Sequence, residues 1–163
     1  MSFSIRPATV ADAAAICEIY NYYVLNTVIS FELEAVSVTE MEGRITEISS
    51  LFPWLVYEED GRILGYAYAT KWKARKAYRH SVESSVYMAQ GSGGKGIGSK
   101  LYGALFAQLK ELGVHAVMGG IAQPNVGSVA LHEKMGFVKV AHFAEVGQKH
   151  NQWIDVAYWQ LIL

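Results

Sequence analysis

Hydrophobic and polar residues along this chain repeat with two different periods, which together predict an α/β architecture. Strand-like patterns occur in segments 3–6, 54–58, 63–69, 81–88, 114–121, 137–146 and 153–163. Apolar residues three and four positions apart, the spacing of one helix face, occur in segments 12–23, 37–50, 101–112 and 125–134. This order of elements predicts a mixed, mostly antiparallel sheet flanked by helices.

Local signals indicate where several of these elements begin and end. Ser37, followed three residues later by Glu40, is a capping pattern, so we expect a helix to begin there. Asp60-Gly61 between two β-rich segments predicts a tight hairpin. A leucine stripe predicts a long amphipathic helix that Gly113 ends, with apolar positions at Leu101, Leu105, Leu109 and Leu112.

Composition and charge narrow the class of protein. The 163 residues, 52% of them apolar, suit one domain over 1–163 with a full core. Since 14 Lys and Arg residues nearly balance 15 Asp and Glu residues, the net charge of -1 supplies no field for a nucleic acid partner. Cys17 is the only cysteine, so no intramolecular disulfide can form. Without a signal-peptide pattern or a membrane-spanning apolar run, we expect a cytoplasmic protein with no membrane partner.

Five glycines lie in segment 90–100, QGSGGKGIGSK, between a predicted strand and the long predicted helix. Such a loop exposes backbone N–H groups at a helix N-terminus, which is a binding site for phosphate. A flexible turn is the plain alternative. A Walker loop is excluded because Gly96, and not Ser or Thr, follows Lys95. A dinucleotide site is disfavoured because the next predicted strand ends without the acidic residue that would bind a ribose.

Segment 70–80, TKWKARKAYRH, places five Lys and Arg residues among aromatic residues and shows neither period. We interpret it as a loop over a pocket. In the strand that follows, Glu83, Ser85 and Tyr87 share one face, while Val82, Val86 and Met88 share the other. The glycine-rich segment follows this strand directly.

Motifs along nearly the whole chain resemble those of one known family. The segment Gly94-Lys95-Gly96-Ile97-Gly98, with Asn125, Ser128 and segment 131–137 downstream, resembles the acetyl-CoA site of the GCN5-related N-acetyltransferase (GNAT) family. Further segments look like its phosphinothricin and methionine sulfoximine acetyltransferase branch, namely 6–8, 72–87, 122–125, 132–137 and 153–156.

The resemblance implies a GNAT fold, with a splayed central strand beside the glycine-rich loop, and acetyl-CoA as co-substrate with no metal. It implies cofactor binding by Val86, Tyr87, Met88, Gly94, Lys95, Gly96, Ile97, Gly98, Ser99, Asn125, Ser128 and Lys134. The family's loop usually opens with Arg or Gln where this chain has Gly93, which removes one contact near the pyrophosphate. Backbone donors do most of the binding in such a loop, and we expect Lys95 and Lys100 to add positive charge.

Acetyl transfer to an amine needs a base, a stabilised oxyanion and a protonated leaving thiol. An α-amine has a pKa near 8, so a base must remove a proton, and Glu83 is the candidate, directly or through a water. An ion pair with Arg75 or Arg79 is the alternative role for Glu83. The resemblance places His132 as the general acid, with a surface histidine as the alternative, and backbone N–H groups at 86–88 as the oxyanion site.

The basic loop is the candidate for substrate selection. Arg75 and Arg79 offer planar forks suited to a carboxylate, with a solvated basic surface as the alternative. The predicted substrate-binding residues are Phe31, Trp72, Lys73, Ala74, Arg75, Tyr78, Arg79, Glu83, Ser84 and Ser85.

These residues predict an enzyme that acetylates the α-amine of small amino-acid-like molecules. The resemblance implies substrates of the phosphinothricin, methionine sulfoximine or methionine sulfone type. The resemblance further implies a homodimer in which this loop lies near the partner chain. A protein N-terminal or lysine acetyltransferase, or a CoA-binding module without catalysis, is the alternative.

Overall fold

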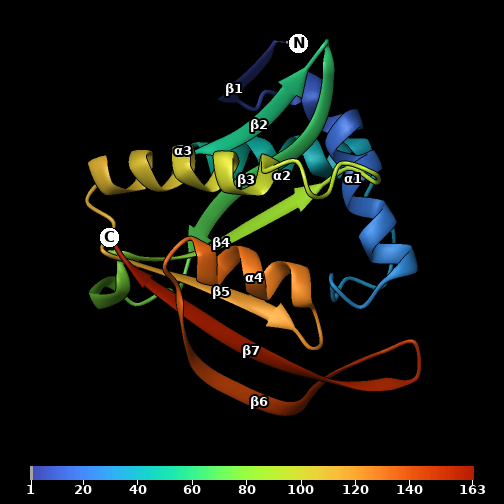
Figure 1. Cartoon of the computed structure of the whole chain (residues 1–163). Helices are drawn as coiled ribbons and strands as arrows, with labels where there is room; N and C mark the ends of the chain where they lie inside the picture. Colours follow the sequence, from blue (N-terminus) through green and yellow to red (C-terminus); the bar gives the residue numbers. More distant parts are fainter. Residues whose placement is uncertain (1) are drawn as a thin grey trace.

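Across the described residues 2–163, seven strands form one mixed sheet with helices on both faces (Figure 1). In this computed structural model the strands are β1 Phe3–Pro7, β2 Trp54–Glu59, β3 Arg62–Lys71, β4 Ser81–Met88, β5 Ala116–Ala122, β6 Val138–Lys149 and β7 Gln152–Ile162. The α-helices are α1 Ala13–Asn26, α2 Val38–Ser49, α3 Ile97–Glu111 and α4 Val126–Lys134, and the 3-10 turns are η1 Val10–Asp12 and η2 Lys76–Tyr78. The expected fold class is confirmed.

The order of strands in the sheet is β1-β2-β3-β4-β5-β7-β6. Strands β4 and β5 run parallel, and every other described pair of neighbours is antiparallel. Their pairing covers Ser81 with Ala116, Val82 with Val117 and Glu83 with Met118, and then stops. Because β4 continues to Met88 without β5 beside it, the centre of the sheet is splayed open.

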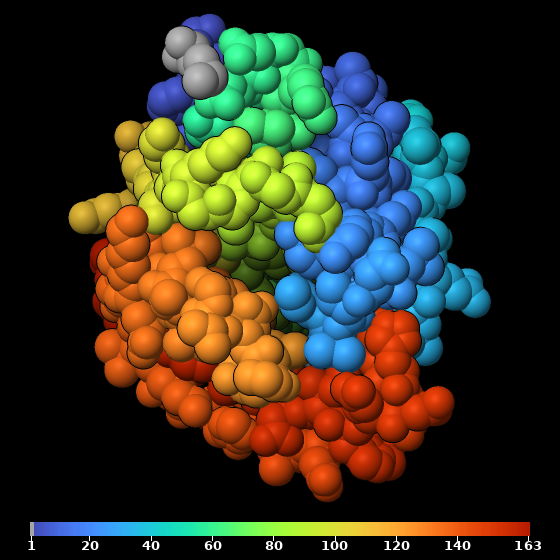
Figure 2. Space-filling model, turned by 45° about the vertical axis from the view of Figure 1, so that its right-hand side comes forward, coloured from blue at the N-terminus to red at the C-terminus, as the bar shows by residue number. Residues whose placement is uncertain are grey.

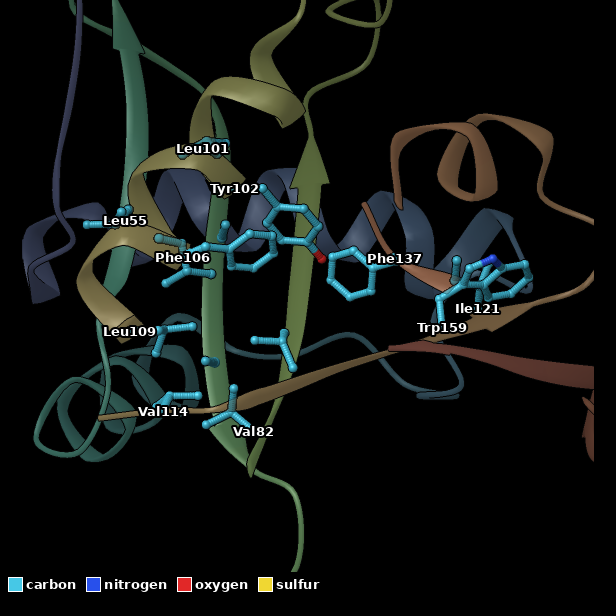
Figure 3. Packing of buried hydrophobic residues seen from close by; sticks show 14 of the residues in the cluster. Leu55, Val82, Leu101, Tyr102, Phe106, Leu109, Val114, Ile121, Phe137 and Trp159 are labelled. Atoms are coloured by element: carbon cyan, nitrogen blue, oxygen red, sulfur yellow. The ribbon is translucent and has the colours of Figure 1, made fainter. Parts of the chain in front are cut away.

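Helices α3 and α4 cover one face of the sheet, and α1 and α2 cover the other. The core under α3 and α4 includes adjacent aromatic rings of Tyr102, Phe106 and Phe137 (Figure 3). The core under α1 and α2 contains Trp54 and Tyr66. Side chains of β4 alternate between these two cores as predicted, so Glu83 and Ser84 point to opposite faces.

Most local signals predicted the elements well. Ser37 caps α2 through Oγ, which accepts a hydrogen bond from the backbone N–H of Glu40 (3.1 Å). Asp60 and Gly61 both have positive φ, at 49° and 76°, as a tight hairpin with the twist of its strands requires. One position of the predicted leucine stripe was wrong, since Leu112 lies beyond the end of α3 and is 60% exposed.

Candidate active site

The glycine-rich loop presents an uncapped helix N-terminus. Gly96 precedes α3 in the left-handed conformation (φ 74°), and it has no side chain that could accept from the first-turn N–H groups. No heavy atom lies within 4 Å of the Cβ that could be added at Gly93, Gly94 or Gly96, so the space over the loop is open. These donors therefore fit a phosphate group.

A groove of about 490 Å³ runs from this loop along β4 and α4. In Figure 2 it is part of the hollow between the glycine-rich loop, the end of α1 and α4. Eleven of the twelve predicted cofactor-binding residues line it: Val86, Tyr87, Met88, Gly94, Gly96, Ile97, Gly98, Ser99, Asn125, Ser128 and Lys134. The twelfth, Lys95, is exposed on the loop. Lys100 does not line the groove, because its Nζ lies 4.4 Å from the ring centroid of Phe3.

The free edge of β4 supplies backbone groups to this groove. The N–H of Ala89 donates to the carbonyl of Leu64 on the β3 side (2.8 Å), and such groups alternate along an antiparallel strand. The N–H groups of Val86 and Met88 therefore point away from β3, toward the splayed opening. Tyr23 donates from its hydroxyl to the carbonyl of Met88 (2.6 Å), which faces the same way.

A narrow passage of about 150 Å³ crosses the sheet where β4 and β5 separate. Asn125 and Ser128 lie at this passage and also line the groove. The side chain of Asn125 caps α4, because its Oδ1 accepts from the N–H of Ser128 (3.1 Å). Asn125 thus has a structural role at the start of α4, and binding of a ligand by the side chains of Asn125 and Ser128 stays a prediction.

On the far side, the passage joins a cavity of about 730 Å³, which we call the tyrosine cavity. Its lining includes the predicted residues Phe31 and Glu83. The other lining residues are Tyr20, Ile29, Ser30, Glu32, Tyr87, Gly120, Ala122, Phe143, Val146, Val156 and Tyr158. Glu83 and Tyr87 line both the passage and the cavity, so the two spaces adjoin each other.

Glu83 is a half-buried carboxylate at this junction. The described residues include no hydrogen bond or ion pair to its side chain, so the alternative of a pair with Arg75 or Arg79 is not realised here. Burial raises the pKa of Glu83, because desolvation disfavours the charged form. An unpaired carboxylate with a raised pKa is a more effective proton acceptor than an exposed one.

His132 is buried, with 3% of its surface exposed, so the alternative of a surface histidine was wrong. Its Nδ1 lies 2.7 Å from the carbonyl oxygen of Ser128, and its Nε2 lies 3.3 Å from the hydroxyl of Tyr102. Since a carbonyl only accepts, Nδ1 carries the hydrogen of the neutral ring. Desolvation lowers the pKa of His132, so the ring is neutral near pH 7.

A hydrogen-bonded network that the sequence did not reveal supports one wall of the tyrosine cavity. Arg44 holds Glu32 with two bonds, from Nη1 to Oε2 (2.8 Å) and from Nη2 to Oε1 (2.6 Å). Tyr20 donates to Glu32 and also contacts Ser30. The buried Lys149 donates to the carbonyl of Ser30 (2.6 Å), which fixes segment 27–37 against β6.

The basic loop lies apart from these spaces within one chain. Lys73, Ala74, Arg75, Tyr78 and Arg79 are exposed and line neither the passage nor the cavity. Trp72 is half-buried and packs edge-to-face on Tyr158, whose ring lines the cavity. Ser84 and Ser85 line the passage instead. The roles of these residues in substrate binding stay predictions.

The sequence and the fold of this chain match those of known proteins. Residues 5–158 match the model of the acetyltransferase (GNAT) domain. The chain belongs to the GNAT family. It is 40% identical to the phosphinothricin N-acetyltransferase of Streptomyces viridochromogenes, over 96% of this chain and 85% of the relative. It is 37% identical to the L-methionine sulfoximine/L-methionine sulfone acetyltransferase of Salmonella typhimurium, over 98% and 94%.

A solved acetyltransferase structure from Salmonella typhimurium, with acetyl-CoA as its cofactor, superposes with a TM-score of 0.96 at 36% identity, and the match covers 100% of this chain and 95% of that one. The present GNAT protein is thus an N-acetyltransferase with acetyl-CoA as its co-substrate. Within residues 2–163 no helix is long and apolar enough to cross a membrane. In the same range no group of three or more His, Cys, Asp and Glu side chains could hold a metal ion.

Proposed function

We propose that this enzyme acetylates the α-amine of small amino-acid-like substrates, of the phosphinothricin, methionine sulfoximine or methionine sulfone type, by direct transfer from acetyl-CoA. The observation that carries the proposal is the position of Glu83, an unpaired and half-buried carboxylate where the tyrosine cavity meets the passage to the groove. The names of the relatives support the same class of acceptor.

The residues of the groove suit acetyl-CoA. The uncapped start of α3 provides donors for the pyrophosphate, and the free edge of β4 provides N–H groups for an extended arm. Acetyl-CoA supplies the activated acetyl group and leaves as a thiol. The N–H groups of Val86 and Met88 lie at the opening where the acetyl oxygen would need donors.

The tyrosine cavity suits the acceptor. An ammonium group that enters it meets Glu83, which removes one proton and leaves a nucleophilic amine. Phe31, Phe143 and Val146 provide apolar walls for a short side chain. In this proposal Glu83 acts as the base and acetyl transfer needs no covalent enzyme intermediate.

Arg75 and Arg79 are proposed to bind the acceptor's carboxylate. Because both are exposed and line neither the passage nor the tyrosine cavity of their own chain, this role requires the loop to reach the cavity of a second protomer. We therefore propose a homodimer in which each loop completes the partner's site.

The experiment is a thiol-release screen with acetyl-CoA and free amino acids, their sulfone, sulfoximine and phosphinate analogues, the matching carboxyl amides, and short peptides. We expect turnover of the free acids, with a specificity constant reduced by roughly 10- to 150-fold in Arg75→Ala or Arg79→Ala. The exposed Arg62, at the start of β3, gives a matched control, Arg62→Ala. Preferred acetylation of amides or peptides by the wild type would contradict the proposal and favour a protein acetyltransferase.

A further inference from the structure

A buried chain of hydroxyl groups connects His132 to the passage. Ser84 donates from Oγ to the hydroxyl of Tyr102 (3.2 Å), and the Tyr102 hydroxyl lies 3.3 Å from Nε2 of His132. The exposed fractions of these three residues are 5%, 1% and 3%. All three nevertheless line the passage between β4 and β5, so the chain ends where the reaction must occur.

The direction of donation along these hydrogen bonds follows from the contact between His132 and the Ser128 carbonyl. Because the Ser128 carbonyl accepts from Nδ1, the neutral ring has a lone pair on Nε2 and can only accept there. Tyr102 then donates to His132, and its oxygen is free to accept from Ser84. In this state His132 is ready to take up a proton and has none to give from Nε2.

The hydrogen-bonded series from Ser84 to His132 and the carboxylate of Glu83 lie on opposite faces of the sheet. Adjacent residues of β4 point to opposite faces, so Glu83 faces the tyrosine cavity, whereas Ser84 faces α3 and α4. The groove for acetyl-CoA lies on the face of Ser84. Glu83 is therefore placed for the proton that the ammonium group loses first, and a second group must exchange protons on the thioester side.

We propose that Ser84, Tyr102 and His132 form a proton relay that takes the second N–H proton of the attacking amine and returns it to the sulfur of the departing thiol. This inference rests on the proposed function. As the N–H bond breaks, Oγ of Ser84 receives the proton, the proton of Ser84 moves to Tyr102, and that of Tyr102 moves to Nε2 of His132. As the C–S bond breaks, the three transfers reverse and an S–H bond forms. The relay ends unchanged, and the one net proton of the reaction leaves through Glu83.

Tyr102→Phe is the decisive variant, because it removes the connecting hydroxyl and keeps the buried ring. We expect kcat to fall by about 10- to 100-fold with the KM for acetyl-CoA unchanged. We also expect the solvent deuterium isotope effect on kcat to decrease, since fewer protons move in the rate-limiting step. Ser84→Ala should cause a similar loss, and the double variant should lose little more than either single variant. Tyr66→Phe, at an equally buried tyrosine on the other face, is the matched control.

A kcat within about twofold of wild type for Tyr102→Phe, or an unchanged isotope effect, overturns the relay. If the variant does not fold, nitrogen-15 NMR of His132 in the wild-type enzyme still decides. A hydrogen on Nδ1 and a free Nε2 support the relay, and a hydrogen on Nε2 in the neutral ring overturns it. Kinetics are measured with methionine sulfone and with a primary amine that lacks a carboxylate. If only the simple amine is turned over, the proposed acceptor class is contradicted. The effect of Tyr102→Phe on kcat and on the isotope effect can then still be measured with that amine.

Discussion

Replacing Gly119 by alanine tests whether this glycine exists to make room for His132. A Cβ at Gly119 would lie 2.7 Å from both Cδ2 and Nε2 of the imidazole, whereas ordinary contact begins at 3.4 Å. The ring would have to shift by roughly 0.7 Å to restore contact distance. It has little freedom to do so, because Tyr102 and Phe137 pack against it and Ser128 binds its Nδ1.

Overpacking of this kind costs about 1 to 3 kcal/mol of unfolding free energy. For a domain of this size, that corresponds to a decrease of roughly 2 to 12 °C in Tm. The displacement of the His132 ring also moves its Nε2 away from Tyr102, so we expect both kcat and Tm to fall. The assays are thermal unfolding and thiol release with acetyl-CoA in excess.

Gly103→Ala is the matched control. Gly103 lies in the middle of α3, and no heavy atom within 4 Å would meet its Cβ apart from the helix's own nearby backbone. Alanine should therefore stabilise the helix by about 0.5 to 1 kcal/mol. The reasoning is refuted if Gly119→Ala has wild-type Tm and kcat, or if both variants lose stability equally.

Three further substitutions give distinct expected results. Glu83→Gln should lower kcat by roughly 10²- to 10⁴-fold. It should also raise the free energy of unfolding at pH 7. Burial raises the pKa of Glu83 above 4.5, so ionisation of the wild-type carboxyl lowers the stability of the folded protein as the pH rises above 4.5. Urea unfolding at pH 7 and below pH 4.5 checks the sign, and a stability gain that persists at the lower pH would contradict it. Gly120→Ala would place a Cβ 2.8 Å from the Tyr158 ring, which is half-exposed and can move; the KM for the acceptor should rise while Tm and the KM for acetyl-CoA stay near wild type. Gly93→Arg should lower the Kd for acetyl-CoA in a titration, because its Cβ meets open space beside the phosphate site, and Gly93→Ala should not.

Local chemistry made much of the fold predictable. The cap at Ser37, the hairpin at Asp60-Gly61 and the alternation along 81–88 each depend on interactions within a few residues, and the structure confirms them. The glycine-rich loop was equally predictable, since a position with left-handed backbone conformation before a helix favours glycine. The other residues that line the groove were implied by the resemblance to the GNAT family and not by this loop.

Long-range packing made the rest of the site unpredictable. Tyr20 has the spacing of a core residue in α1, and nothing in its neighbourhood indicates that Glu32 accepts its hydroxyl or that Tyr158 lies across the same cavity. In the sequence, Gly119 and Gly120 show only that this strand ends without a carboxylate, whereas in three dimensions they leave space for the rings of His132 and Tyr158. Such roles depend on which strands become neighbours, and the chain order alone does not determine that.

The short pairing between β4 and β5 also has a mechanical consequence. Three residue pairs join the block formed by β1 to β4 to the block formed by β5 to β7 in the centre of the sheet, while β3 and β4 pair over seven positions. The sheet therefore has an internal hinge line, and its unpaired edge is shielded from other chains because it lies inside the molecule. A ligand bound along that edge contacts both blocks and restrains their relative movement. The amide hydrogens of Val86 and Met88 should then exchange slowly with acetyl-CoA bound and rapidly without it. Binding of the co-substrate would thus make the protein more rigid.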